Sequence, residues 1–363
     1  MARVTALWAL AFNVLASGIL MLGAAPRLAH AAAPAPGTRV STSTIHGAGA
    51  TFPAPVYQAW AADYARTTGV NVTYDPVGSG AGIERIRAHQ VDFGATDAPL
   101  DAPELATAGL AQFPAVIGGV VPVLNIRGIA PGQLQLTGAL LADIYLGRIR
   151  RWNDPRIVAF NPGVALPGAN ITVVHRDDRS GSSHLWSDYL SRSNTEWRRA
   201  VGASTAPAWP TGVGGTGNEG VASYVERTRF SIGYVEYAFA RAHHLSDVAL
   251  LNAGGQRVRA GRESFHAAAA AMDWTTNLSQ QMPTDLPGPG VWPITGASFI
   301  LVDRAPSQAA PVHAALQFFH WALQHEAGIT TSLDYLPLPP AAVEQLPRQW
   351  QALRDSSGRP LWP

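Results

Sequence analysis

The order strand, glycine-rich turn, helix recurs along this chain and indicates its fold class. Thr44 to His46 is expected to form a short strand, and a glycine-rich turn follows at 47–53. From Val56 onward, apolar residues recur at spacings of three and four, which predicts a helix. The same order returns within residues 70–88, where Gly78 to Gly82 is the turn. The repetition predicts an α/β fold with an essentially parallel sheet.

The rest of the chain continues this pattern. Further strands are expected at 91–95, 116–126, 171–174, 231–235 and 298–302, and further helices at 140–146, 184–190, 221–225, 265–272, 312–325 and 341–353. The strand at 116–126 is expected to be interrupted at Gly118 and Gly119. Gly212 to Gly217 matches the letters of a dinucleotide-binding fingerprint, but a Pro-containing run precedes it instead of a strand. That run is therefore interpreted as a structural loop.

Composition excludes several classes of function. The 363 residues are 47% hydrophobic and 14% charged, enough for the core of one large or two medium domains. The 26 basic residues, all arginine, nearly balance 25 acidic ones, so no field for nucleic acid or acidic lipid is expected. The absence of cysteine excludes disulfides, thiolate zinc sites, a cysteine nucleophile and lipid attachment at an N-terminal cysteine. The histidines show no metal-binding spacing, and neither a metal nor a cofactor is expected.

The N-terminal segment 1–31 has the pattern of a secretory signal peptide. Arg3 precedes an apolar run from Ala6 to Ala25, and Ala29-His30-Ala31 has the small-x-small pattern of a cleavage site. The alternative is an uncleaved membrane anchor, because the apolar run is about as long as a spanning helix. The polar residues within the run and the small residues after it favour cleavage, which predicts an exported, soluble protein.

Three turns place hydroxyl groups and backbone N–H groups at the start of a helix. They are Thr51-Phe52, Ser79-Gly80 and Ser180-Gly181-Ser182. The first N–H groups of a helix have no internal partner and lie at the positive end of its dipole, so each turn can bind an anion. The alternative is that these hydroxyls are ordinary helix N-caps.

Arg176 and Asp97 add charge to these turns. Arg176 lies four residues before Ser180 and offers a planar fork of donors to an oxyanion. Asp97 ends a predicted strand, where open α/β sheets bind ligands, and its carboxylate suits an oxyanion that carries a proton, such as phosphate. The alternative for Asp97 is an N-cap of the next helix.

Long runs of this sequence resemble a known family. The segments 47–57, 78–79 and 91–100, together with 112–120, 143–147, 233–237 and 355–358, are similar to the periplasmic phosphate-binding protein of the high-affinity phosphate ABC transporter. The resemblance covers nearly all of the chain after the leader. It implies a two-lobed venus-flytrap fold, type II-like, that encloses inorganic phosphate between its lobes.

The resemblance also implies a site and partners. Phosphate would contact Thr51, Phe52, Ser79, Asp97, Arg176, Ser180, Gly181 and Ser182, and Asp178 would pair with Arg176. Lobe one would combine 32–119 with 296–363, and lobe two would be 120–295. The protein would be a periplasmic monomer and would deliver phosphate to the permease subunits of an ABC importer. Arg179 stands where the family often has glycine, which leaves its effect on the loop open.

Two other functions remain as alternatives. The same fold could bind another tetrahedral oxyanion, such as sulfate, molybdate or tungstate. A phosphoester hydrolase could use Ser182, Ser183 and His184, but neighbours in a helix point in different directions and no Gly-x-Ser-x-Gly elbow is present. The sequence therefore predicts a binding protein and not an enzyme.

Overall fold

The structure is a computed structural model that describes residues 44–274, 278–280 and 283–363. The described residues belong to one compact unit, Thr42–Pro363. The predicted signal peptide, 1–31, and its membrane-anchor alternative lie outside the described residues. Within the described residues, no helix has both the length and the apolar character needed to cross a membrane.

Helices and strands alternate through most of the described chain. The strands are β1 (Ile45–Gly49), β2 (Val72–Asp75), β3 (Phe93–Thr96), β4 (Leu110–Leu124), β5 (Gln135–Leu136), β6 (Thr172–Arg176), β7 (Val213–Gly215), β8 (Ser231–Glu236), β9 (Ser246–Asp247), β10 (Ala249–Leu251), β11 (Arg257–Val258) and β12 (Thr295–Asp303). The helices are α1 (Ala54–Thr68), α2 (Ser79–Arg87), α3 (Ala102–Ala108), α4 (Gly138–Tyr145), α5 (Pro155–Phe160), α6 (Gly181–Ser193), α7 (Thr195–Ala200), α8 (Gly217–Arg227), α9 (Tyr237–Ala242), α10 (Arg262–Ala270), α11 (Ala309–His325), α12 (Ala327–Ser332) and α13 (Pro340–Trp350).

The main sheet is mixed, so the prediction of an essentially parallel sheet is wrong. Its order is β2-β1-β3-β12-β4-β8-β6-β7, with β9 also paired to β4. The outer strands pair in parallel, as β1 does with β2 and β3, and β6 with β7 and β8. In the middle, β12 is antiparallel to both β3 and β4, and β4 is antiparallel to β8. The reason is the chain path, since β12 brings the chain back alongside β4 in the opposite direction.

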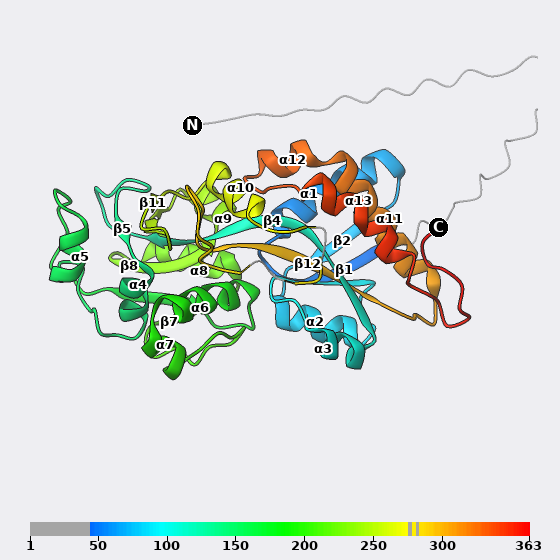
Figure 1. Cartoon of the computed structure of the whole chain (residues 1–363), viewed down its shortest axis with the longest axis horizontal. Helices are drawn as coiled ribbons and strands as arrows, with labels where there is room; N and C mark the ends of the chain where they lie inside the picture. Colours follow the sequence, from blue (N-terminus) through cyan, green and yellow to red (C-terminus); the bar gives the residue numbers. More distant parts are fainter. Residues whose placement is uncertain (1–43, 275–277, 281–282) are drawn as a thin grey trace, which may run out of the picture. The chain divides into compact units, whose positions relative to one another are not determined.

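The long strands β4 and β12 connect the two halves of the sheet (Figure 1). Helices α1, α11 and α13 lie near β1 and β2, whereas α4, α6 and α7 lie in the half that contains β6 and β7. The loops that end β1, β3 and β6 thereby come together from both halves. The lobe boundaries expected from the sequence stay a prediction.

Two glycine-containing segments differ from their predictions. Strand β4 runs through Gly118 and Gly119 without interruption, because these glycines make room for aromatic rings. A Cβ on Gly118 would lie 2.8 Å from the Phe52 ring, and one on Gly119 would lie 2.2 Å from the Phe265 ring. The segment interpreted as a loop contains strand β7, which gains a parallel ladder with β6. Only this tertiary pairing makes so glycine-rich a segment a strand.

Candidate anion-binding site

The start of α2, the end of β3 and the start of α6 meet at the Ser79 hydroxyl. Its Oγ accepts hydrogen bonds from the backbone N–H of Asp97 at 3.2 Å and from that of Gly181 at 3.1 Å. Ser79 and Gly181 are 102 residues apart in the sequence. A Cβ on Gly181 would lie 2.6 Å from the Asp97 Cβ, so the glycine permits this close approach. Three of the predicted site residues are thus in direct contact.

Arg176, the last residue of β6, is buried with one side of its guanidinium paired. Its Nε donates to Asp178 Oδ1 at 2.6 Å, its Nη2 donates to Asp178 Oδ2, and the Gly217 N–H donates to Oδ1 at 3.1 Å. Burial raises the pKa of Asp178, but Arg176 and the backbone N–H groups of Gly217 and Asp178 together hold that pKa below its usual value. Among the described residues, the buried Nη1 of Arg176 has no hydrogen-bond partner. The pair expected between Arg176 and Asp178 is therefore present, and one donor group of Arg176 remains available.

The α6 N-terminus carries two hydroxyls that differ in use. Ser180 is the N-cap, and its Oγ accepts from the Ser183 N–H at 3.1 Å. Ser182 Oγ is buried and has no partner within the described part of the chain. The capping alternative therefore holds for Ser180, whereas Ser182 offers an unused hydroxyl at the start of α6.

The loop after β1 holds Thr51 and Phe52. Thr51 Oγ1 accepts from the side-chain amide of Asn218 at 2.9 Å and from the Asn218 N–H at 3.3 Å. The Phe52 ring is buried, and its carbonyl oxygen accepts from the Tyr335 hydroxyl at 2.6 Å. Helix α1 begins three residues after Thr51 and has no side-chain cap, so Thr51 is not its N-cap. The Thr51 hydroxyl hydrogen remains free to donate.

Asp97 is 1% exposed and faces the same region. Burial raises its pKa to about 7, although a hydrogen bond to Ser298 and the charge of Arg176 act in the opposite direction. The alternative that Asp97 caps the next helix is wrong, because the N-cap of α3 is Asp101, whose side chain accepts from the Glu104 N–H. Local sequence could not choose between two aspartates four residues apart.

Arg179 points away from these groups. It is exposed, and its Nη1 donates to Glu84 Oε1 at 2.9 Å. Its carbonyl accepts from the Gly80 N–H at 2.9 Å, and its own φ is not positive. The arginine therefore fits the loop without backbone strain and connects it to α2.

Several partners of the site were not found from the sequence. Asn218 lies at the start of α8, Ser298 lies in β12, and Tyr335 follows α12. Each contacts a predicted site residue far from it in the sequence. Only the glycine-rich run before α8 gave a local signal, and it pointed to a different ligand class.

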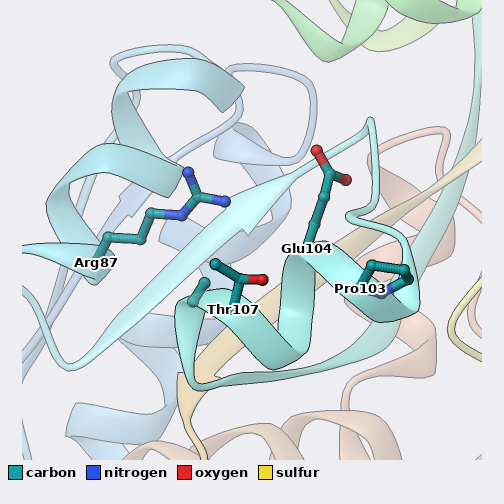
Figure 2. A pocket seen from close by; sticks show the side chains of 5 residues that line it. Arg87, Pro103, Glu104 and Thr107 are labelled. Atoms are coloured by element: carbon teal, nitrogen blue, oxygen red, sulfur yellow. The ribbon is translucent and has the colours of Figure 1, made fainter.

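Two pockets differ in their relation to the predicted residues. A pocket of about 310 Å³ is lined by Thr51, Asp178 and Gly217 and adjoins the site. A pocket of about 500 Å³, shown in Figure 2, is lined by Arg87, Pro103, Glu104, Thr107 and Ala108 and contains none of the predicted site residues. Only the pocket beside Thr51 is therefore relevant to the predicted anion site.

The residues expected for a hydrolase are not arranged as a nucleophile beside a base in the described part of the chain. Ser183 Oγ lies 2.6 Å from the Tyr234 hydroxyl, and His184 lines a separate pocket with Pro99 and Leu100. No hydrogen bond joins Ser182 or Ser183 to the His184 ring among the described residues. In the same residues, no group of three or more histidine or acidic side chains is arranged to hold a metal ion.

Comparisons with known proteins agree on one family. A family model described as a PBP superfamily domain matches residues 32–326. The chain is 47% identical over 323 residues to the phosphate-binding protein PstS of Xylella fastidiosa (strain Temecula1), covering 89% of each chain. It is 46% identical over 321 residues to PstS of Pasteurella multocida, covering 88% of this chain and 93% of the relative. The solved phosphate-binding protein from Stenotrophomonas maltophilia superposes with a TM-score of 0.66 at 19% identity, covering 85% of this chain and 94% of that one.

These matches define both the fold and the family of the chain. The fold is the α/β, two-lobed fold of the periplasmic binding proteins, as the resemblance implied. Within that class, the chain belongs to the family of phosphate-binding proteins called PstS. The family resemblance stated from the sequence is confirmed.

Proposed function

We propose that this protein captures inorganic phosphate between its two lobes and delivers it to the permease subunits of an ABC importer. The relatives at 46–47% identity are named phosphate-binding proteins and match this chain over nearly its whole length. Binding without chemical conversion is the activity, and no step requires a cofactor.

The observation that carries the proposal is a pair of buried donors without partners in the described part of the chain, on Arg176 and Ser182, together with the buried Asp97, whose carboxyl feels the charge of Arg176. Arg176 Nη1 and Ser182 Oγ are buried without partners in the described residues. An unpaired buried donor costs about 1 to 3 kcal/mol, and an oxyanion would remove that cost at both atoms. Asp97 would accept a hydrogen bond from the O–H group of hydrogen phosphate.

The remaining contacts follow from the same arrangement. Thr51, Phe52, Ser79, Ser180, Gly181 and Ser182 would contribute hydroxyls and helix-start N–H groups, with Arg176 and Asp97 as charged partners and Asp178 restraining Arg176. The Oγ atoms of Ser79 and Ser180 already accept hydrogen bonds from the N–H groups of Gly181 and Ser183, so each hydroxyl would contribute its hydrogen to the anion.

The route to the periplasm belongs to this proposal as well. Segment 1–31 would direct export and be removed, leaving a soluble monomer, and lobes 32–119 with 296–363 and 120–295 would close on the ligand. N-terminal sequencing of protein recovered from a periplasmic fraction tests the cleavage. Recovery of the uncleaved chain with the membrane would contradict it.

Calorimetric titration of ligand-stripped protein with phosphate and with sulfate tests the ligand. We expect tight 1:1 binding of phosphate and much weaker binding of sulfate. Preferential binding of sulfate or molybdate would identify another oxyanion as the ligand. Turnover of a phosphoester by the parent protein but not by Ser182→Ala would support the hydrolase alternative instead.

A further inference from the structure

Behind the Thr51-Phe52 loop lies a buried hydrogen-bond chain that connects it to β8. Glu236 ends β8, is 0% exposed, and caps α9 by accepting from the Ala238 N–H at 2.8 Å. Tyr335 lies between Glu236 and the loop. Its hydroxyl oxygen is 2.9 Å from Glu236 Oε2 and 2.6 Å from the Phe52 carbonyl oxygen.

The number of hydrogens available to Glu236, Tyr335 and Phe52 determines which group donates in each hydrogen bond. A tyrosine hydroxyl has one hydrogen, and a backbone carbonyl can only accept. At 2.6 Å the Phe52 carbonyl therefore takes the Tyr335 hydrogen. The 2.9 Å contact to Glu236 then lacks a hydrogen unless the carboxyl supplies one.

Among the described residues, no cationic side chain forms an ion pair with Glu236. Gly118 and Val120 of β4 bring only apolar atoms and backbone, and the Asn218 amide of α8 accepts from the Glu236 N–H at 2.9 Å. Asp334, next to Tyr335, adds a negative charge, and Arg241 of α9 lies 3.8 Å from that aspartate. An ionised carboxylate here would be buried without an ion-pair partner and stabilised only by hydrogen bonds, at a cost above that of a neutral acid.

We infer that Glu236 is a protonated carboxylic acid that donates to Tyr335, which in turn donates to the Phe52 carbonyl and positions the loop that carries Thr51 and Phe52. Glu236 is a positioning residue in this scheme, since it acts on the ligand through Tyr335. The inference rests on the proposed function for its effect on phosphate. The protonation of Glu236 itself is independent of that function.

Other features of the structure agree with this assignment. Burial raises the pKa of Glu236 well above its usual value, against the opposing effects of the Tyr335 contact and of the Ala238 and Tyr237 N–H groups. The Tyr335 pKa is raised by burial, then by Glu236, and further by Asp97 and Tyr57, so its hydroxyl stays neutral. Tyr335 is also held in place, because Leu336 pairs with Ile117 of β4 through a β-bridge.

Leu336, next to Tyr335, pairs with Ile117 of β4, and Glu236 pairs with Val120 of the same strand. Lobe opening that bends β4 between these two residues would separate Tyr335 from Glu236 and admit water to the carboxyl. The closed form would then keep the Glu236 proton to a higher pH than the open form. Rising pH would favour the open form, and phosphate affinity would fall by at most about tenfold per pH unit, because one proton is involved. Phosphate itself and Asp97 also titrate, so a matched variant is needed to isolate Glu236.

Carbon-13 NMR of protein labelled only at the glutamate carboxyl reads the proton directly, without contribution from Asp97. We expect one resonance, absent from Glu236→Gln, that remains in the acid form at neutral pH. An ionised Glu236 at neutral pH, sharing the single Tyr335 hydrogen in a forked bond, would overturn the inference. This readout does not require phosphate, so it can fail or succeed separately from the proposed function.

The pH dependence of binding provides the second arm. The ratio of phosphate affinities, parent to Glu236→Gln, should fall as pH rises, since glutamine donates to Tyr335 at every pH. Glu344→Gln, an exposed position on α13, is the matched control and should follow the parent. Parallel profiles for the parent and Glu236→Gln would contradict the positioning role.

Tyr335→Phe distinguishes the two bonding patterns even if Glu236→Gln does not fold. When the acid donates to Tyr335, removal of the hydroxyl lowers the Glu236 pKa, because the acid form loses its acceptor. When Tyr335 donates to an ionised carboxylate, the same change raises that pKa. The sign of the change in the labelled resonance therefore supports or overturns the inference.

Discussion

Asp97 is the residue that we expect to set selectivity, through its proton. Its carboxyl, with a pKa raised by burial to about 7, only accepts hydrogen bonds above that pH and can donate below it. Sulfate, which brings no proton, should be rejected above this pH and tolerated better below it. Competition calorimetry from one pH unit above the Asp97 pKa to one unit below it should show the preference for phosphate over sulfate falling as the pH falls.

Asp97→Asn provides the comparison for this prediction. The amide donates at every pH, so discrimination against sulfate should be weak and independent of pH, whereas phosphate affinity should change little. If the variant rejected sulfate as firmly as the parent, selectivity would have to come from lobe closure.

Arg176→Ala should be the most damaging single change to phosphate binding. It removes a charge-assisted bond worth about 1.5 to 3 kcal/mol, or roughly ten- to over a hundredfold in affinity. Ser182→Ala should cost less, because the N–H groups of the α6 first turn remain. Calorimetry on both variants checks the order.

Because Arg176 also neutralises Asp178, its removal should destabilise the fold as well. The double variant Arg176→Ala with Asp178→Asn should regain thermal stability without regaining affinity. Recovery of phosphate binding in the double variant would show that Arg176 does not contact the ligand.

At the scale of elements, the close approach of α6 to α2 and β3 depends on Gly181. An added Cβ would lie 2.7 Å from Ser79 Oγ as well as close to Asp97, so Gly181→Ala should force these elements apart. We expect phosphate affinity to fall at least about tenfold, since one displaced charge-assisted bond suffices for that loss.

Gly328→Ala is the matched control for that substitution. It lies in α12, has an ordinary φ, and no atom would lie within 4 Å of its new Cβ. Its binding should equal that of the parent, and its melting temperature should not fall. Equal affinity in Gly181→Ala would show that the close packing is not needed for binding.

At the scale of the whole molecule, ligand binding and lobe closure should appear together. A ligand present at a hundred times its dissociation constant stabilises the folded state by about 2.7 kcal/mol. Phosphate should therefore raise the melting temperature of stripped protein, and X-ray scattering should show a smaller radius of gyration. Thermal stabilisation without compaction would contradict closure around β4 and β12 while leaving the ligand assignment intact.

Local sequence patterns predict the type of each main element and the candidate site residues. Apolar spacing marks α1 and α11, and hydroxyls at helix starts, with Arg176, indicate an anion. These signals are local, because propensity, capping and glycine turns involve residues within a few positions of one another.

The sequence did not predict the antiparallel strand pairs or the strand at Val213–Gly215. It also did not predict that Asn218, Tyr335 and Glu236 form hydrogen bonds behind the predicted site. The protonation of Asp97 also depends on the tertiary structure, because burial of its carboxyl raises the pKa of Asp97. Each of these depends on contacts between residues far apart in the chain. Such contacts have no local signature, because the free energy of burial and of ladder pairing exists only once the elements have packed.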